Sequence, residues 1–297
     1  MLLKSTYYQF MKKTKGILII IGGDLYLPSE ANGTEEIGNG EIPEIESAII
    51  TRFCESLTGA THRIEIIPTA SGIPEKAGKQ YIKAFKNLGF ENVGVMDIRT
   101  REDALQEEMV QRAREAEGFL FTGGNQLRLT TILGGTDFLN VIYERYIQEP
   151  VVIAGTSAGA MAMSDTMIYE GSSHEALRKG EVKLSGGFGF IQKMIIDTHF
   201  VQRGRIGRLF QAVAANPSSL GIGLGEDTGL LIRKGDIQEA VGSGLIIVVD
   251  GSGIRHTNLA SISEGELISI ENLSVHVLVP GDVFYLSERK LVPYRTG

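Results

Sequence analysis

Residues 151–163 carry the clearest chemical signal in the chain, because they place a small polar side chain at the apex of a tight turn. They read Val-Val-Ile-Ala-Gly-Thr-Ser-Ala-Gly-Ala-Met-Ala-Met. An apolar run that passes through a glycine into helix formers predicts a strand, a sharp turn and a helix, with the Ser157 hydroxyl exposed as a nucleophile. Gly155 and Gly159 suit such a turn because it leaves little room for Cβ atoms. A glycine- and alanine-rich packing site with an unreactive serine is the alternative.

Two backbone amides are candidates to stabilise the oxyanion that attack by Ser157 would create. The Ala158 amide begins the helix that follows the serine. The Gly124 amide lies in the motif Thr122-Gly-Gly-Asn-Gln126, which follows a buried strand and opens a helix at the sheet edge where ligands bind. In the same motif, Gln126 is placed to hold a substrate amide or carboxylate. The alternative is a plain strand-to-helix turn, and neither glycine-rich phosphate-binding pattern occurs there.

A serine nucleophile needs a base, and one of the five histidines lies where a base is required. His199 ends the segment Ile195-Ile-Asp-Thr-His199, so it is predicted at the carboxyl end of a strand. His174 lies on a loop after the nucleophile helix, where it could line a pocket. The remaining histidines are predicted in turns or on the polar face of a strand: His62, His256 and His276.

The base in turn needs an acid to orient it. Glu226 and Asp227 follow the short apolar strand at 221–225, and Asp197 stands two residues before His199 on the same strand face. An acidic surface turn is the ordinary interpretation of the first two. Spacing alone does not choose among the three carboxylates.

Three arginines, Arg203, Arg205 and Arg208, follow the predicted base directly. On a helix, Arg205 and Arg208 share a face. Guanidinium groups bind carboxylates through paired hydrogen bonds, so the cluster favours a substrate that carries a carboxylate. A solvated helix face is the alternative.

Composition and charge exclude several classes of protein. A net charge of −7 and a pI near 5.4 argue against binding to nucleic acid. Cys54 is the only cysteine, and the chain lacks both an H-E-x-x-H motif and a cysteine–histidine cluster, so we expect no disulfide, no metal and no other cofactor. No run reaches the roughly 18 apolar residues that span a bilayer. We therefore expect a soluble cytoplasmic enzyme that contacts no membrane.

Short apolar strands alternate with amphipathic helices up to residue 154. This pattern implies βαβ crossovers and predicts an α/β fold: a three-layer, mostly parallel doubly wound sheet with helices on both faces. The expected strands are 16–22, 64–68, 93–98, 118–122 and 151–154. The expected helices are 44–58, 76–88, 102–116 and one that follows residue 126.

After residue 190 the pattern changes to short strands separated by turns, which predicts antiparallel β additions in the C-terminal third, with residues 250–297 as an antiparallel edge packed on the same sheet. They are expected at 193–198, 221–224, 229–232, 237–241 and 245–250, with a helix at 203–215. Without a linker or repeat, residues 1–297 are expected to form a single hydrolytic domain. Residues 1–15 are interpreted as a basic lead-in, not a signal peptide, and residues 24–43 as a loop insertion.

In combination these motifs resemble the cyanophycinase family. The resemblance rests on four segments in order, spanning roughly residues 16–297: Phe121-Thr-Gly-Gly-Asn-Gln-Leu-Arg-Leu129, Ala154-Gly-Thr-Ser-Ala-Gly-Ala160, Asp197-Thr-His-Phe200 with the arginines after it, and Gly225-Glu-Asp-Thr228. The family comprises serine peptidases related to dipeptidase E, on the scaffold of class I glutamine amidotransferases. It implies a homodimer that releases β-Asp-Arg dipeptides from cyanophycin, a polyaspartate that carries arginine on each side-chain carboxyl.

The resemblance also assigns roles to individual residues. It implies a catalytic set in which Ser157 is the nucleophile, His199 the base and Glu226 its orienting acid. Oxyanion amides are implied at Gly124 and Ala158. The implied substrate-binding residues are Gln126, Asp197, Thr198, Arg205 and Arg208.

The sequence departs from the family pattern in three places. Asparagine stands at 125 where the family often has aspartate, and threonine at 198 where it often has glutamine. An acidic insertion at 24–46 replaces the usual acidic-lysine segment after the first strand. The departures leave the serine chemistry intact and open the choice of substrate, which is cyanophycin or another β-aspartyl peptide. One alternative is a dipeptidase E-like aspartyl dipeptidase selective for an N-terminal aspartate. The other is a non-catalytic binding module on the same scaffold.

Overall fold

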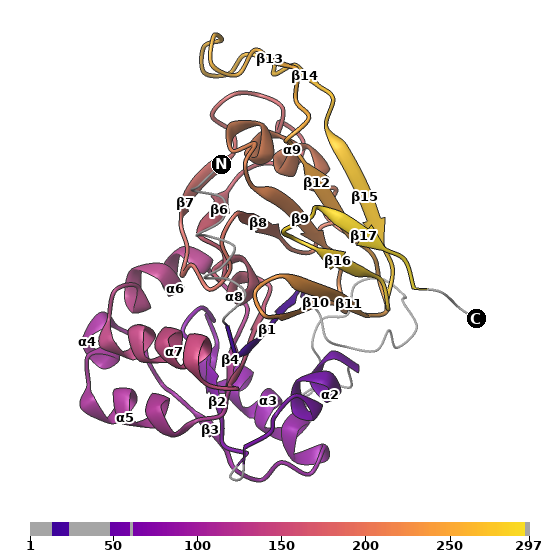
Figure 1. Cartoon of the computed structure of the whole chain (residues 1–297). Coiled ribbons are helices and arrows are strands. Elements are labelled where there is room, and N and C mark those ends of the chain that lie inside the picture. The colour runs from indigo at the N-terminus through magenta and orange to yellow at the C-terminus, as the bar shows by residue number, and fades with distance from the viewer. Residues whose placement is uncertain (1–13, 24–47, 60–61, 295–297) are drawn as a thin grey trace, which may run out of the picture.

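The structure is a computed structural model that describes residues 14–23, 48–59 and 62–294. In this part of the chain the main sheet has nine strands in the order β17-β16-β11-β10-β1-β5-β4-β2-β3 (Figure 1). The parallel half consists of β1 (Ile17–Ile21), β5 (Val152–Thr156), β4 (Gly118–Phe121), β2 (Ile64–Ile67) and β3 (Val93–Val95). The antiparallel half consists of β10 (Thr228–Arg233), β11 (Ile237–Gly242), β16 (Val283–Tyr285) and β17 (Lys290–Val292). The predicted insertion at 24–43 and residues 1–13 of the predicted lead-in lie outside the described residues.

Helices cover both faces of the parallel half, so the predicted three-layer α/β architecture is confirmed. On one side lie α2 (Ala48–Glu55) and α3 (Pro74–Asn87); on the other lie α4 (Arg101–Ala104), α5 (Glu107–Glu115), α6 (Gln126–Leu133) and α7 (Asp137–Gln148) (Figure 1). Successive residues of β1 point to opposite faces, and both sets are fully buried: Leu18 and Ile20 join one core, Ile19 and Ile21 the other.

A second, four-stranded sheet corrects one expectation. Its order is β15 (Ser274–Leu278), β12 (Ile246–Asp250), β9 (Leu220–Leu224) and β8 (Met194–Asp197), with β8 and β9 parallel and the other pairs antiparallel. Helix α9 (Ile206–Ala215) packs against β8, β9 and β12. The prediction that residues 250–297 form an antiparallel edge of the main sheet is confirmed for β16 and β17 and was wrong for β15, because an apolar pattern identifies a strand without naming its partner. Shorter pairs complete the description: β6 (Thr166–Glu170) with β7 (Lys183–Gly186), and β13 (His256–Thr257) with β14 (Ile270–Glu271).

Helix boundaries show where local chemistry overrides periodicity. The segment after residue 126 forms two helices, because Gly134 and Gly135 end α6 and the Thr136 side chain caps α7. The charged helix expected near 102–116 is likewise divided into α4 and α5. In the described residues, none of the helices has the length and hydropathy needed to cross a membrane.

Candidate active site

Ser157 sits on a strained turn between β5 and α8 (Ala158–Met161), as the sequence predicts. Its backbone has φ 51° and ψ −113°, a conformation that costs a non-glycine residue on the order of 1–3 kcal/mol. A Cβ on Gly155 would overlap the Gly159 carbonyl, and one on Gly159 would overlap the Phe121 carbonyl. The two glycines therefore allow the turn to pack tightly against β4, which leaves the serine side chain at the end of the sheet.

Ser157, His199 and Glu226 form a continuous line of hydrogen-bonding atoms. Ser157 Oγ lies 3.0 Å from His199 Nε2, and His199 Nδ1 lies 2.8 Å from Glu226 Oε1. The histidine is 8% exposed, while the Glu226 side chain is 29% exposed. A neutral imidazole in this position can accept the serine proton at Nε2 while its Nδ1–H donates to the carboxylate.

The other two candidate acids have partners of their own. The Asp227 carboxylate accepts a hydrogen bond of 2.7 Å from the Ser243 hydroxyl. The buried Asp197 carboxylate pairs with arginines. Of the three carboxylates that spacing left open, the structure therefore places only that of Glu226 against His199.

The end of β1 and the two glycines after it bind the backbones of Ser157, His199 and Asp227, the residue next to Glu226, and the sequence interpretation missed this feature. Three successive carbonyls accept one hydrogen bond each: Ile21 from the Ser157 amide at 2.9 Å, Gly22 from the His199 amide at 2.8 Å and Gly23 from the Asp227 amide at 3.0 Å. Gly23 has φ +118°, and its Cα lies against the imidazole so closely that a Cβ would overlap the ring. The glycine pair that ends the first strand was the available signal.

The amides proposed for the oxyanion lie beside Ser157 and donate no hydrogen bond within the described residues. A Cβ on Gly123 would come within 3.3 Å of the Ser157 Cβ, so the loop after β4 passes directly by the nucleophile. Gly124 has φ +139° and packs on the Ala70 carbonyl, where a side chain would not fit. Within the described residues, neither the Gly124 amide nor the Ala158 amide donates to another group.

Asp197 is the centre of a buried ion cluster next to the base. Arg208 donates to both carboxylate oxygens, at 2.6 and 2.5 Å, and Arg205 donates to one at 3.3 Å. Arg205 also donates to the Thr198 carbonyl at 2.7 Å. Burial lowers the pKa of Arg205, and the neighbouring positive charges of Arg208 and Arg203 lower it further, against the opposing effect of Asp197. The helix begins at Ile206 instead of the expected 203, because Arg205 occupies the N-cap position and turns back toward β8.

The remaining predicted substrate residues line the same region. The Thr198 side chain is 1% exposed and its hydroxyl has no hydrogen-bond partner among the described residues. Gln126 donates from Nε2 to the carbonyls of Ile168 and Tyr169 in β6, at 3.0 and 3.2 Å. The Thr198 hydroxyl is thus buried without a partner among the described residues, whereas Gln126 is held by its amide nitrogen.

The structure does not bring the other histidines into this line. His62 contacts Phe90 and His276 contacts Phe284, while His174 and His256 are exposed. Across the described ranges, no group of three or more histidine, cysteine, aspartate or glutamate side chains is arranged to hold a metal.

Sequence comparison finds relatives that match most of the chain. The model of peptidase family S51 matches residues 37–240. A cyanophycinase of Nostoc sp. is 34% identical over 290 residues, which cover 98% of this chain and 92% of that protein. A cyanophycinase of Geminocystis herdmanii is 34% identical over 246 residues, which cover 83% of this chain and 90% of that protein.

Structural comparison agrees on the fold. A crystal structure of a peptidase from an acI-B1 actinobacterium superposes with a TM-score of 0.67 and covers 93% of this chain and 99% of its own. The two sequences are 22% identical, so this likeness concerns the fold.

Proposed function

This chain belongs to peptidase family S51, and on that premise we propose that it is a serine exopeptidase that hydrolyses cyanophycin to β-Asp-Arg dipeptides. The observation that carries the proposal is the line from Ser157 through His199 to Glu226, with contacts of 3.0 and 2.8 Å. The substrate is argued from the relatives that bear the name cyanophycinase. We also propose a cytoplasmic homodimer, from composition and the family resemblance; light scattering of the purified protein would test the dimer.

The proposed reaction is acyl transfer in two steps. Ser157 Oγ attacks the peptide carbonyl while His199 Nε2 takes its proton, and the oxyanion is stabilised by the Gly124 and Ala158 amides. His199 then gives that proton to the departing amine, which leaves an acyl-enzyme that water hydrolyses with the same base. Glu226 holds the Nδ1–H and stabilises the imidazolium in both steps.

We propose that the cluster around Asp197 recognises the arginyl side of a substrate repeat, which carries both a guanidinium and a carboxylate. The Arg205 side chain is 14% exposed, more than that of Arg208, so Arg205 is the arginine that would meet a substrate carboxylate. Arg208 is 6% exposed and donates two hydrogen bonds to the Asp197 carboxylate, so it holds that carboxylate in place. Thr198 and Gln126 would supply the neutral hydrogen bonds.

The test is mass spectrometry of the products that the purified enzyme forms from cyanophycin. We expect β-Asp-Arg as the dominant product, and none from Ser157→Ala. Hydrolysis of Asp-X dipeptides to free aspartate and the second amino acid, with no action on cyanophycin, would favour the aspartyl dipeptidase. Binding of cyanophycin without any hydrolysis would favour the non-catalytic module.

A further inference from the structure

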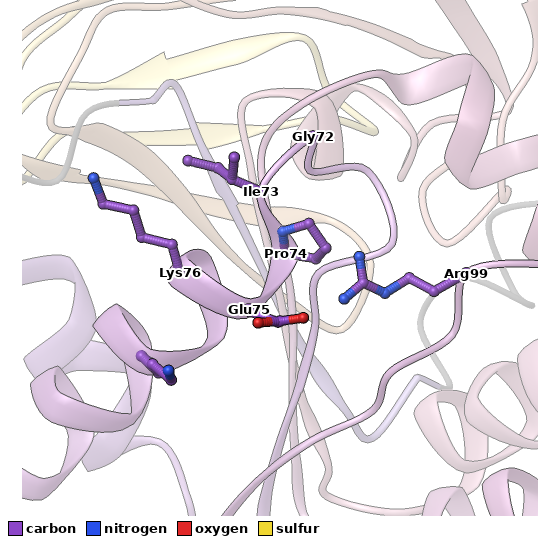
Figure 2. Close-up of a pocket in the computed structure, with 7 residues that line it drawn as sticks. Gly72, Ile73, Pro74, Glu75, Lys76 and Arg99 are labelled. Carbon is purple, nitrogen blue, oxygen red and sulfur yellow. The ribbon is translucent and has the colours of Figure 1, made fainter.

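A cavity with a cationic lining lies at the start of α3. It is open and has a volume of about 650 Å³. Its lining residues come from the loop after β2, the first turns of α3 and the loop after β3: Gly72, Ile73, Pro74, Glu75, Lys76, Lys79 and Arg99. Figure 2 shows Arg99 reaching from its own loop toward Pro74 and Glu75 at the beginning of the helix. We call these residues the cationic cleft.

Two of the three positive charges in the cationic cleft, those of Lys76 and Lys79, have no ion-pair partner among the described residues. Arg99 forms an ion pair with Asp97. In the part of the chain that the structure describes, by contrast, neither Lys76 nor Lys79 forms an ion pair. The positive end of the α3 dipole adds to this potential. The cleft therefore attracts anions, and Glu75 leaves one negative charge beside them for a cation.

The cationic cleft is connected to the active site through the loops at one edge of the sheet. Gly124, the proposed oxyanion donor, packs on Ala70, whose carbonyl also accepts from the Asn125 amide at 3.0 Å. Arg128 donates to the Thr69 carbonyl at 2.9 Å and to the Arg99 carbonyl at 3.2 Å. The loops after β4, β2 and β3 are thus joined in one rim.

The strand order gives the distance that a ligand would have to cover. Ser157 follows β5, and β5, β4, β2 and β3 are consecutive in the sheet. Strands lie about 4.8 Å apart, so the loop after β3 is about 14 Å from the nucleophile along the rim. An extended chain advances at most about 3.5 Å per residue, so about four backbone residues would reach from the scissile bond to the cleft.

We propose that the cationic cleft is an additional binding site for the polymeric substrate, which holds carboxylates several repeats away from the bond being cut. This inference rests on the proposed function, since cyanophycin presents a carboxylate and a guanidinium on each repeat. Lys76 and Lys79 would attract the carboxylates as point charges, and Glu75 would accept from a guanidinium. Such a site lets the enzyme prefer a long chain over a short one without changing the chemical step.

The test compares a long and a short substrate with the double variant Lys76→Gln/Lys79→Gln. The readout is the ratio of kcat/KM for cyanophycin to kcat/KM for a chain of two β-Asp-Arg repeats, which is too short to reach the cleft. We expect the ratio to fall about three- to tenfold through a higher KM for the polymer, as suits the loss of two exposed charge contacts. Lys86→Gln, at the far end of α3 in an exposed ion pair with Glu91, is the matched control and should not change the ratio.

Salt dependence gives a second readout. The wild-type KM for the polymer should rise with ionic strength more steeply than that of the double variant, because exposed charge contacts are screened. An unchanged ratio, or an equal fall with Lys86→Gln, would overturn the additional binding site. If the wild-type enzyme cleaves neither substrate, the proposed function fails instead, so the two failures are distinct.

Discussion

Ser157 and the two amides that we propose for the oxyanion come from the parallel half of the main sheet, whereas His199 and Glu226 follow β8 and β9 of the second sheet. The first group is positioned locally: a few adjacent residues and their glycines determine where the hydroxyl points. The second group is positioned at long range, by backbone hydrogen bonds from His199 to Gly22 and from Asp227, next to Glu226, to Gly23. The difference implies that changes in the two halves will harm the enzyme in different ways.

The largest effect is expected from the nucleophile. Ser157→Ala removes one hydroxyl and leaves the turn intact, so kcat on cyanophycin should fall by at least about 10⁴-fold with little change in the free energy of unfolding. His199→Ala should be comparably damaging, since members of a triad act as a unit. Single-turnover kinetics and denaturant unfolding on the same samples test both statements. Substantial hydrolysis by Ser157→Ala would remove the serine from the mechanism.

The next effect separates the two acids in the turn after β9. Glu226→Gln should lower kcat by about 10²–10⁴-fold, because the imidazolium loses its charge partner. Asp227→Asn should stay close to wild type, since the Asp227 carboxylate bonds to Ser243. Steady-state kinetics of both variants on one substrate give the comparison. A deep loss in Asp227→Asn with a nearly normal Glu226→Gln would reverse the assignment.

A smaller loss is expected where the two halves join. Gly23→Ala places a methyl group against the imidazole of His199, and a shift of about 1 Å in the base should lower kcat about 100-fold. Gly89→Ala is the matched control, because Gly89 also has a positive φ, +86°, and a Cβ there would meet open space. Equal kcat values for the two alanine variants would show that backbone strain, and not contact with the base, is what matters at Gly23.

The smallest kinetic effect and a clear loss of stability are expected at the ion cluster. Asp197→Asn leaves the buried Arg205 and Arg208 without their carboxylate, which should lower the free energy of unfolding by about 3–5 kcal/mol. We expect kcat to fall less than in Glu226→Gln. Denaturant unfolding gives the free energy, with Glu149→Gln, which loses an exposed ion pair to Arg145, as a control near wild type. Wild-type stability in Asp197→Asn would mean that the cluster serves binding alone.

Sequence patterns predicted the region around Ser157 better than the second sheet, which carries His199 and Glu226, and the reason is physical. The turn at Ser157 is determined by residues close to it in the sequence, so its geometry can be predicted from one short segment. The partner strands of β8, β9, β12 and β15 are chosen by tertiary packing, which an apolar run does not encode. Gly22 and Gly23 contact His199 across more than 170 residues of sequence. The glycine pair is visible in the sequence, but its contact with the base could not be predicted from it. Alternating strands and helices sufficed for the three layers, because βαβ crossovers leave few alternatives.

The most direct test of the proposed mechanism is covalent labelling with a fluorophosphonate, followed by peptide mass spectrometry. The reagent reacts with a serine whose hydroxyl is activated by a base. We predict a single adduct on the peptide that contains Ser157, no adduct in Ser157→Ala, and much slower labelling in His199→Ala. An adduct on a different residue, or labelling that persists in Ser157→Ala, would contradict the assignment of Ser157 as the nucleophile.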